Sequence, residues 1–265
     1  MAKKSEALVK TGKTDLTKLE PWEQELANEA TNEASKETLG VPRITHKGGI
    51  LKYNEKKVPN NEILVATIDY AHTKAYYEDE FEEGKPQTPV CYASGKDEAT
   101  LVPHVQAPKK QSDTCSTCPH NQFGTALKGR GKRCKDERRL MVVAPTNNEV
   151  ETLQKVDVAQ ISVPPDSLKF FAKYLKSDAL NELTPLGIRG VITKIKPEPS
   201  ESGGHNITFE AMEALPKKAV QALIARRPSV QDALLGPYPV IKSDDEPEQT
   251  EAEKAKAAKL RKKVQ

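Results

Sequence analysis

Four cysteines, all between positions 91 and 134, constrain this chain more than any other feature of its sequence. Cys115 and Cys118 form a Cys-x-x-Cys pair, Cys134 follows after fifteen intervening residues, and Cys91 precedes the pair. Such a pair can turn two thiolates onto one ion, and long loops can supply the other two ligands of tetrahedral zinc. We therefore predict a structural Zn²⁺ site with Cys91, Cys115, Cys118 and Cys134 as ligands. Zinc would order a polar loop that has no core of its own.

Three alternatives to this zinc site stay open. A thioredoxin-like redox pair requires a βαβ context, whereas Pro119-His120-Asn121 follows Cys118 here. His104 or His120 could replace Cys91 as the fourth ligand, and the four thiols could also be unconnected. A site with four cysteine ligands leaves no open position for a substrate, so zinc would not be catalytic. No other enzyme motif is evident, and we predict that the protein is not an enzyme.

A basic segment surrounds the last cysteine. Between Lys109 and Arg139 there are nine Lys or Arg residues against three acids, a surplus of six. Glycines let a backbone approach a polyanion closely, and basic side chains neutralise phosphates. A solvated surface loop is the alternative interpretation. The predicted nucleic-acid contacts are Lys128, Arg130, Lys132, Arg133, Lys135, Arg138 and Arg139.

Aromatic side chains near this segment could stack on unpaired bases. Tyr77, Tyr92 and Phe123 are the predicted stacking residues, although an aromatic residue at any one such position is more often part of a core. Phe123 lies in a polar stretch and is the best candidate for exposure. Phe171, by contrast, is predicted to be core, because it follows Leu168 at helical spacing.

Short strand signals dominate the middle of the chain. We expect a hairpin around Gly48-Gly49, and we expect strands at 62–70, 88–92, 140–144, 158–163, 187–195 and 205–211. Helices are expected only from Leu168 to Leu175 and over Lys217–Leu235. This pattern favours a mainly β fold with inserted helices, in the form of a small barrel.

Composition bounds the rest of the chain. Of the 265 residues, 36% are hydrophobic and 30% are charged, so part of the chain is expected to lie outside a core. We predict a flexible segment at 1–40, a nucleic-acid-binding domain at 41–240 and a charged, disordered or helical tail at 241–265. No apolar run has the length of a membrane span or a signal peptide, so we expect a soluble intracellular protein without a membrane partner.

Several of these motifs resemble a known family. Pro89-Val-Cys91-Tyr, Cys115-Ser-Thr-Cys118-Pro-His-Asn, Gly129-Arg-Gly-Lys-Arg-Cys134 and Val163-Pro-Pro-Asp-Ser-Leu168 are similar to segments of single-stranded-DNA-binding proteins of tailed bacteriophages. The resemblance covers about residues 41–212. It implies an oligonucleotide-binding (OB) barrel with a zinc loop at 91–134, acting in the cytoplasm of an infected bacterial host. Its expected role is to coat single-stranded DNA during phage replication or recombination, with replication or recombination proteins as further partners.

One feature departs from single-strand binders of bacteria and phages, which commonly end in an acidic tail. Here the acidic run 244–253 is followed by basic residues. Recruitment of partners through the tail is therefore in doubt. The alternative function is a zinc-containing accessory protein that docks on replication or transcription machinery. The oligomeric state, and the preference for DNA or RNA, stay open.

Overall fold

The computed structural model describes residues 41–79, 87–127, 129–145, 147, 149–201 and 203–238. The predicted flexible segment 1–40, the tail 241–265 and Lys128 lie outside the described residues. The strands are β1 (Arg43–Lys47), β2 (Ile50–Tyr53), β3 (Lys56–Lys57), β4 (Ile63–Tyr76), β5 (Cys91–Gly95), β6 (Cys134–Val143), β7 (Val158–Val163), β8 (Val191–Pro199) and β9 (His205–Ala214). The α-helices are α2 (Val150–Lys155), α3 (Leu168–Leu175), α4 (Asp178–Leu183), α5 (Lys217–Ala225) and α6 (Arg227–Leu235). Short 3₁₀ helices are η2 (Pro59–Asn61), η3 (Glu98–Thr100), η4 (Pro119–Asn121), η5 (Pro165–Ser167) and η6 (Gly187–Gly190).

The nine strands of the described residues form one mixed sheet. Its order is β3-β2-β1-β7-β6-β4-β8-β9, and β5 pairs with β4 beside this path. All pairings are antiparallel except that of β1 with β7. The prediction of a mainly β fold with inserted helices is thus confirmed. Over the described residues the sheet is open, because β3 and β9 end its path without pairing with each other, so the prediction of a small barrel is not confirmed.

A Greek key lies at the centre of this sheet. β4, β6 and β7 follow one another as antiparallel neighbours, and β8 then returns to the other side of β4. This gives the spatial order fourth, first, second, third that defines the motif. The connection from β7 to β8 contains α3, α4 and η6. β9 extends the sheet beyond β8.

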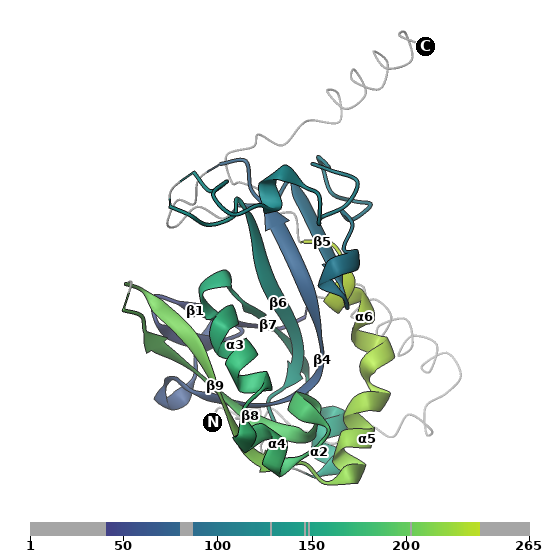
Figure 1. Cartoon of the computed structure of the whole chain (residues 1–265). Helices are drawn as coiled ribbons and strands as arrows, with labels where there is room; N and C mark the ends of the chain where they lie inside the picture. The colour runs from purple at the N-terminus through teal and green to yellow at the C-terminus, as the bar shows by residue number, and fades with distance from the viewer. Residues whose placement is uncertain are drawn as a thin grey trace, which may run out of the picture. The chain divides into compact units, whose positions relative to one another are not determined.

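β4 links the core to the cysteine-bearing loops. Its first residues pair with β8, whereas its long second part pairs with β6 and, from His72 to Tyr76, with β5. A β-bulge between Thr67 and Asp69 interrupts the pairing of β4 with β6 near its start. In Figure 1 the loops between β4 and β6 gather at one end of these strands, whereas α4, α5 and α2 lie at the other end. The loops are therefore positioned by strands that run beyond the main core.

The main core is formed by aliphatic side chains of the sheet and one face of α3. Val65, Leu140, Ile161 and Ile195 are fully buried, and Phe171 packs against them at 2% exposure. The prediction that Phe171 is a core residue is confirmed. No helix in the described ranges is long and apolar enough to cross a lipid bilayer.

The predicted hairpin around Gly48-Gly49 is also confirmed. β1 and β2 pair across this turn, and both glycines have positive φ, of 59° and 74°. A two-residue turn with positive φ at both positions is the type I′ turn, which matches strand twist and favours glycine.

Several element boundaries differ from the prediction. β4 continues beyond the expected end at position 70 to Tyr76, and β6 begins at Cys134 rather than at position 140. The helix expected over Lys217–Leu235 is divided into α5 and α6, because Pro228 starts a new helix rather than continuing one. The strand expected at 187–195 begins only at Val191, after the turn η6. The strand expected at 88–92 begins at Cys91 and ends at Gly95.

Candidate metal centre and nucleic-acid interface

The four cysteines line one small cavity, together with Lys74, Asn121 and neighbouring residues. Cys91 starts β5 and Cys134 starts β6, and both pair with Tyr76 at the end of β4. The strand register therefore brings these two thiols to the same level on either side of β4. Cys115 and Cys118 come from the loop that leads into η4. All four thiols are buried and free.

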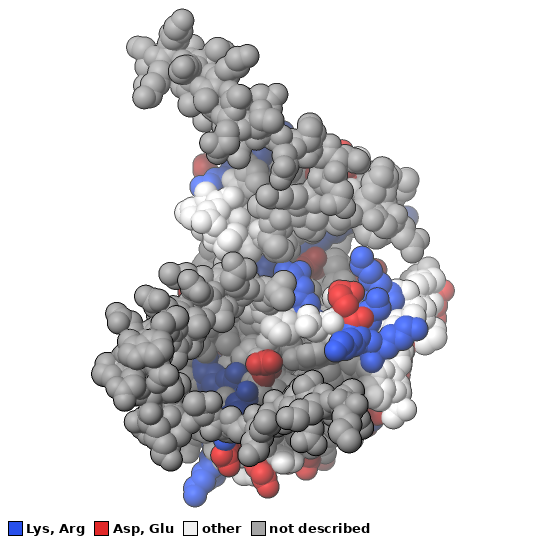
Figure 2. Space-filling model, turned by 180° about the vertical axis from the view of Figure 1, so that it is seen from behind, with Lys and Arg blue, Asp and Glu red and all other residues white. Residues whose placement is uncertain are grey.

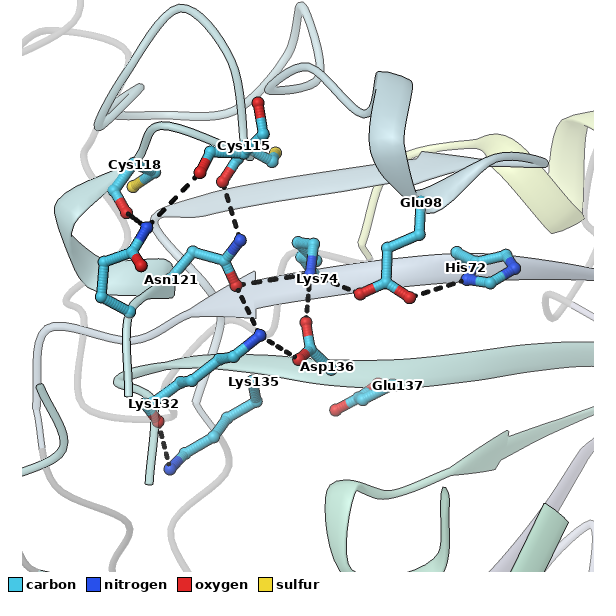
Figure 3. A network of polar contacts seen from close by, with 12 residues as sticks. His72, Lys74, Glu98, Cys115, Cys118, Asn121, Lys132, Lys135, Asp136 and Glu137 are labelled. Carbon is cyan, nitrogen blue, oxygen red and sulfur yellow. Dashed lines mark hydrogen bonds and ion pairs between the residues drawn. The ribbon is translucent and has the colours of Figure 1, made fainter. Parts of the chain in front are cut away.

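Hydrogen bonds hold the Cys115–Cys118 turn in place. Asn121 donates from Nδ2 to the carbonyl oxygen of Cys115 at 2.8 Å, and Gln122 donates from Nε2 to that of Cys118 at 3.4 Å. The backbone N–H of Cys115 donates to the carbonyl of Leu101 at 3.0 Å. Figure 3 shows Asn121 and the turn above β4 and β6. The turn is therefore anchored by these polar contacts together with the small apolar cluster that Cys115 forms with Ala93 and Leu101.

Burial perturbs the thiols. It raises the pKa of Cys115 to about 11 and that of Cys134 to about 12, and the other thiols of the cluster add to both shifts while Lys74 opposes them. Metal ligands must be thiolates, so zinc binding here would release protons. Among the described residues, no three His, Cys, Asp or Glu side chains are arranged as they stand to hold a metal ion. The structure brings the four predicted ligands to one cavity without showing a metal site.

The two histidines considered as alternative ligands each stack on a tyrosine ring. His120 stacks on Tyr76 with ring centroids 4.4 Å apart, and His104 stacks on Tyr92 at 5.2 Å. Neither histidine lines the cavity, whereas all four cysteines do. The geometry thus favours four cysteines over a histidine variant.

A buried lysine lies beneath the cysteine turn. Lys74 is 3% exposed, and its Nζ contacts Glu98 Oε1 at 3.1 Å and Asn121 Oδ1 at 3.3 Å, as well as Asp136 Oδ1. Lys132 contacts the same Asp136 at 2.8 Å and the same Asn121 at 3.2 Å. Figure 3 shows the Lys74 ammonium between the carboxylates of Glu98 and Asp136. Since Asn121 also binds Cys115, this network connects the cysteine turn to the strands below it.

Glu98 extends the network along β4. Its Oε2 lies 3.2 Å from His72 Nδ1 and 2.9 Å from Arg138 Nη2. Burial alone would raise the pKa of Glu98, but Lys74 and Arg138 outweigh it and lower the pKa to about 2. The carboxylate therefore stays ionised. None of Lys74, His72 and Glu98 was predicted as a site residue, because no local pattern marks charges that meet only through strand pairing.

Arg139 is not available to a ligand in this structure. It is 4% exposed, and its Nη1 contacts the carbonyl oxygens of Ala233, Leu234 and Gly236 at 3.2, 3.1 and 3.1 Å. The ring of Tyr238 covers its guanidinium at 4.9 Å. Arg139 thus satisfies the carbonyls at the C-terminal end of α6, and we exclude it from the nucleic-acid contacts proposed below.

The other predicted basic residues divide into paired and exposed side chains. Arg138 and Lys132 are paired with acids as described, and Arg133 donates to the carbonyl of Glu78 at 2.5 Å while lying over the ring of Tyr76. Arg130 and Lys135 are exposed. In Figure 2, where described residues are visible, basic and acidic side chains lie next to one another rather than forming one basic patch.

The predicted stacking residues differ in exposure. Phe123 is 81% exposed, and Lys132 Nζ lies 5.0 Å from its ring centroid. Tyr92 is buried between His104 and Tyr238 and offers no free face for a base. Tyr77 is half-buried, and burial together with the charge of Glu137 raises its pKa to about 12. Of the three predicted residues, Phe123 is the one positioned for stacking.

Comparison with known proteins gives no guide to the site. The chain matches no family model, no curated protein and no solved structure. Function is therefore inferred from the geometry of the chain itself.

Proposed function

We propose that this protein binds single-stranded DNA through the loop between β4 and β6. The OB fold is a five-stranded, partly open Greek-key barrel. It binds oligonucleotides on the face of its second and third β-strands and on two loops, one of which joins its first two β-strands. β4, β6, β7, β8 and β9 would be the five strands, with the Greek-key order already described. The loop between the first two of them then carries Cys91, Cys115 and Cys118.

The observation that carries the proposal is the exposed Phe123 on this loop. A side chain of that size at 81% exposure presents most of its ring to solvent, and the Lys132 ammonium lies over the ring, 5.0 Å from its centroid. Stacking of bases on an aromatic ring, combined with neighbouring cations, is how proteins bind single strands without sequence preference. Phe123 would stack on a base, while Arg130 and Lys135 would neutralise phosphates.

Zinc is part of the same proposal, in a structural role. Cys91, Cys115, Cys118 and Cys134 would ligate one Zn²⁺ after small movements of their side chains into the shared cavity. Such a site would fix the loop that presents Phe123. The expected readout is one zinc per chain and loss of loop order on chelation. Metal-free protein with an unchanged fold and four titratable thiols would contradict it.

The biological setting follows the resemblance to single-stranded-DNA-binding proteins of tailed bacteriophages. We propose that the protein coats single strands during phage replication or recombination in the host cytoplasm. A binding role rather than catalysis fits a cavity whose four thiols would all be used by the metal. The second candidate is an accessory protein that docks on replication or transcription machinery, and the exposed Val105 and Leu127 on the same loop favour it.

Fluorescence anisotropy with labelled oligo-dT and a matching duplex tests the proposal. Binding to oligo-dT should be tighter than binding to duplex and should weaken linearly in the logarithm of salt concentration. Phe123→Ala should cost about 1–3 kcal/mol of binding free energy. Ile224→Ala is the control, since Ile224 is an exposed apolar residue of α5, outside this loop. Binding to neither DNA would overturn the proposal in favour of the docking protein, and an unaffected Phe123→Ala variant would remove Phe123 from the interface.

A further inference from the structure

A second cluster of basic side chains surrounds a buried carboxylate away from the cysteine loop. Asp69 lies at the β-bulge of β4 and is 2% exposed. Lys96, just beyond β5, reaches Asp69 Oδ2 at 2.5 Å. Arg189 of η6 and Arg227 of α6 reach Oδ1 at 2.8 and 3.3 Å. Three separate elements thus each place one cation on a single carboxylate.

The charges of this cluster do not balance. Asp69 is already served by Gln231 Nε2 at 3.4 Å and by the backbone N–H of Tyr70 at 2.9 Å, and it still receives three cations. Burial alone would raise the pKa of Asp69, but Arg189 and Lys96 lower it, so the carboxylate contributes one negative charge. Three positive charges against one leave a surplus of two. A purely structural ion pair would not need extra cations, because removing each additional cation partly from water costs free energy.

The cations keep part of their surface in solvent. The side chains of Lys96, Arg189 and Arg227 are 45%, 29% and 34% exposed, although Asp69 between them is buried. The Nε atoms of both arginines are buried and have no hydrogen-bond partner among the described residues. Asp69 therefore holds the three charged groups in place from the inside, while part of each side chain stays exposed to solvent.

The position of the cluster relates it to the proposed interface. Asp69 and Tyr76 lie on the same strand, seven residues apart, which corresponds to about 23 Å at the rise of a β-strand. Tyr76 marks the level of the cysteine cavity. The Arg189 guanidinium also lies 5.2 Å over the ring of Tyr70, which fixes its orientation next to Asp69. β4 thus connects the cysteine loop to this cluster.

We propose that Lys96, Arg189 and Arg227, held by Asp69, bind backbone phosphate of the same single strand that contacts the cysteine loop. This inference rests on the proposed function and adds a second contact region to it. Arginine forks and lysine ammonium groups are the usual partners of phosphate oxygens, and they carry no sequence information. Because β4 is mostly buried between the two regions, the DNA strand would pass over the protein surface from Phe123 to the exposed parts of these three side chains.

The test measures binding of the full chain to oligo-dT of about 20 nucleotides, a length that exceeds the usual site size of one OB fold. The variants are K96Q and R227Q, singly and combined. Arg189 is left in place, so that Asp69 keeps a hydrogen-bonded counter-ion and the variants fold. Each phosphate contact contributes a slope of about −0.7 to the dependence of log K on log salt for single strands. At about 0.1 M salt, each substitution should therefore weaken binding about fivefold, and the double variant about 25-fold.

The control is K155Q, which removes one exposed lysine from an ion pair with Glu151 on α2. It should leave the affinity and the salt slope unchanged, and circular dichroism should show native folding for all variants. Wild-type binding with an unchanged double variant would overturn this inference alone and assign the cluster a structural role. Absence of binding by the wild type would overturn the proposed function, and this inference with it.

Discussion

Replacing Arg139 by methionine should destabilise the protein strongly without removing any exposed charge. The Nη1 nitrogen carries two hydrogens, and they serve the three carbonyls at the end of α6. Two charge-assisted hydrogen bonds at about 1.5–3 kcal/mol each would amount to about 3–6 kcal/mol. Burying methionine costs less desolvation than burying a guanidinium, which offsets part of this loss. We expect the free energy of unfolding to fall by about 3–5 kcal/mol.

Urea denaturation followed by circular dichroism measures this effect. The midpoint should fall while the m-value stays constant, because the surface exposed on unfolding is unchanged. Arg130→Met is the matched control, since Arg130 is exposed, and it should stay within about 0.5 kcal/mol of wild type. If Arg139→Met lost less than about 1 kcal/mol, the carbonyls of α6 would have to be satisfied in another way, and the capping role assigned to Arg139 would be refuted.

Three further predictions concern the network and the cysteines. Lys74→Met should lower the free energy of unfolding by about 2–3 kcal/mol in urea titrations. This is less than the usual cost of breaking a buried ion pair, because Asp136 and Glu98 each keep a second cation. An unchanged free energy of unfolding would contradict a stabilising role of the Lys74 contacts. Glu98 has its pKa lowered from 4.5 to about 2, so it stabilises the fold above pH 4.5 and this contribution is lost as the pH falls towards 2. Thermal unfolding of Glu98→Gln across that window should show a shallower acid loss than wild type, and parallel curves would argue against the ion pairs. Cys118→Ser should reduce bound zinc well below one per chain by elemental analysis, whereas undiminished zinc would exclude Cys118 as a ligand.

Much of the fold could be predicted from local pattern. The alternation at 158–163 and the spacing from Leu168 to Leu175 match β7 and α3, since each element is specified by its own apolar face. The Gly48-Gly49 turn could also be predicted, because glycine readily adopts the positive φ that this turn requires. The length of β4 could not be predicted, because positions 71–76 lack the run of aliphatic side chains found at 62–70 and form a strand through their pairing with β5 and β6.

The site could be predicted only where the residues carry their own chemistry. The Cys-x-x-Cys spacing led to four cysteines that do share a cavity, and the polar surroundings of Phe123 indicated its exposure. The density of basic residues led to the wrong prediction that Arg139 contacts nucleic acid, because its partners, the carbonyls of α6, are about a hundred residues away in the sequence. Asp69 gave no signal at all for the same reason, since its cations come from positions 96, 189 and 227.

The docking of α6 has a consequence for how the chain reaches its native state. Two buried charges on the central strands, Asp69 and Arg139, find partners on or just after α6, near the end of the described residues. Contacts across such separations form late, because loop closure must precede them. During synthesis, Arg139 would thus leave the ribosome long before its carbonyl partners, and its burial could be completed only after Gly236 has emerged. A chain that stops before α6 would leave Arg139 without these partners in the middle of its sheet, whereas Asp69 would keep Lys96 and Arg189 and lose only Arg227 and Gln231.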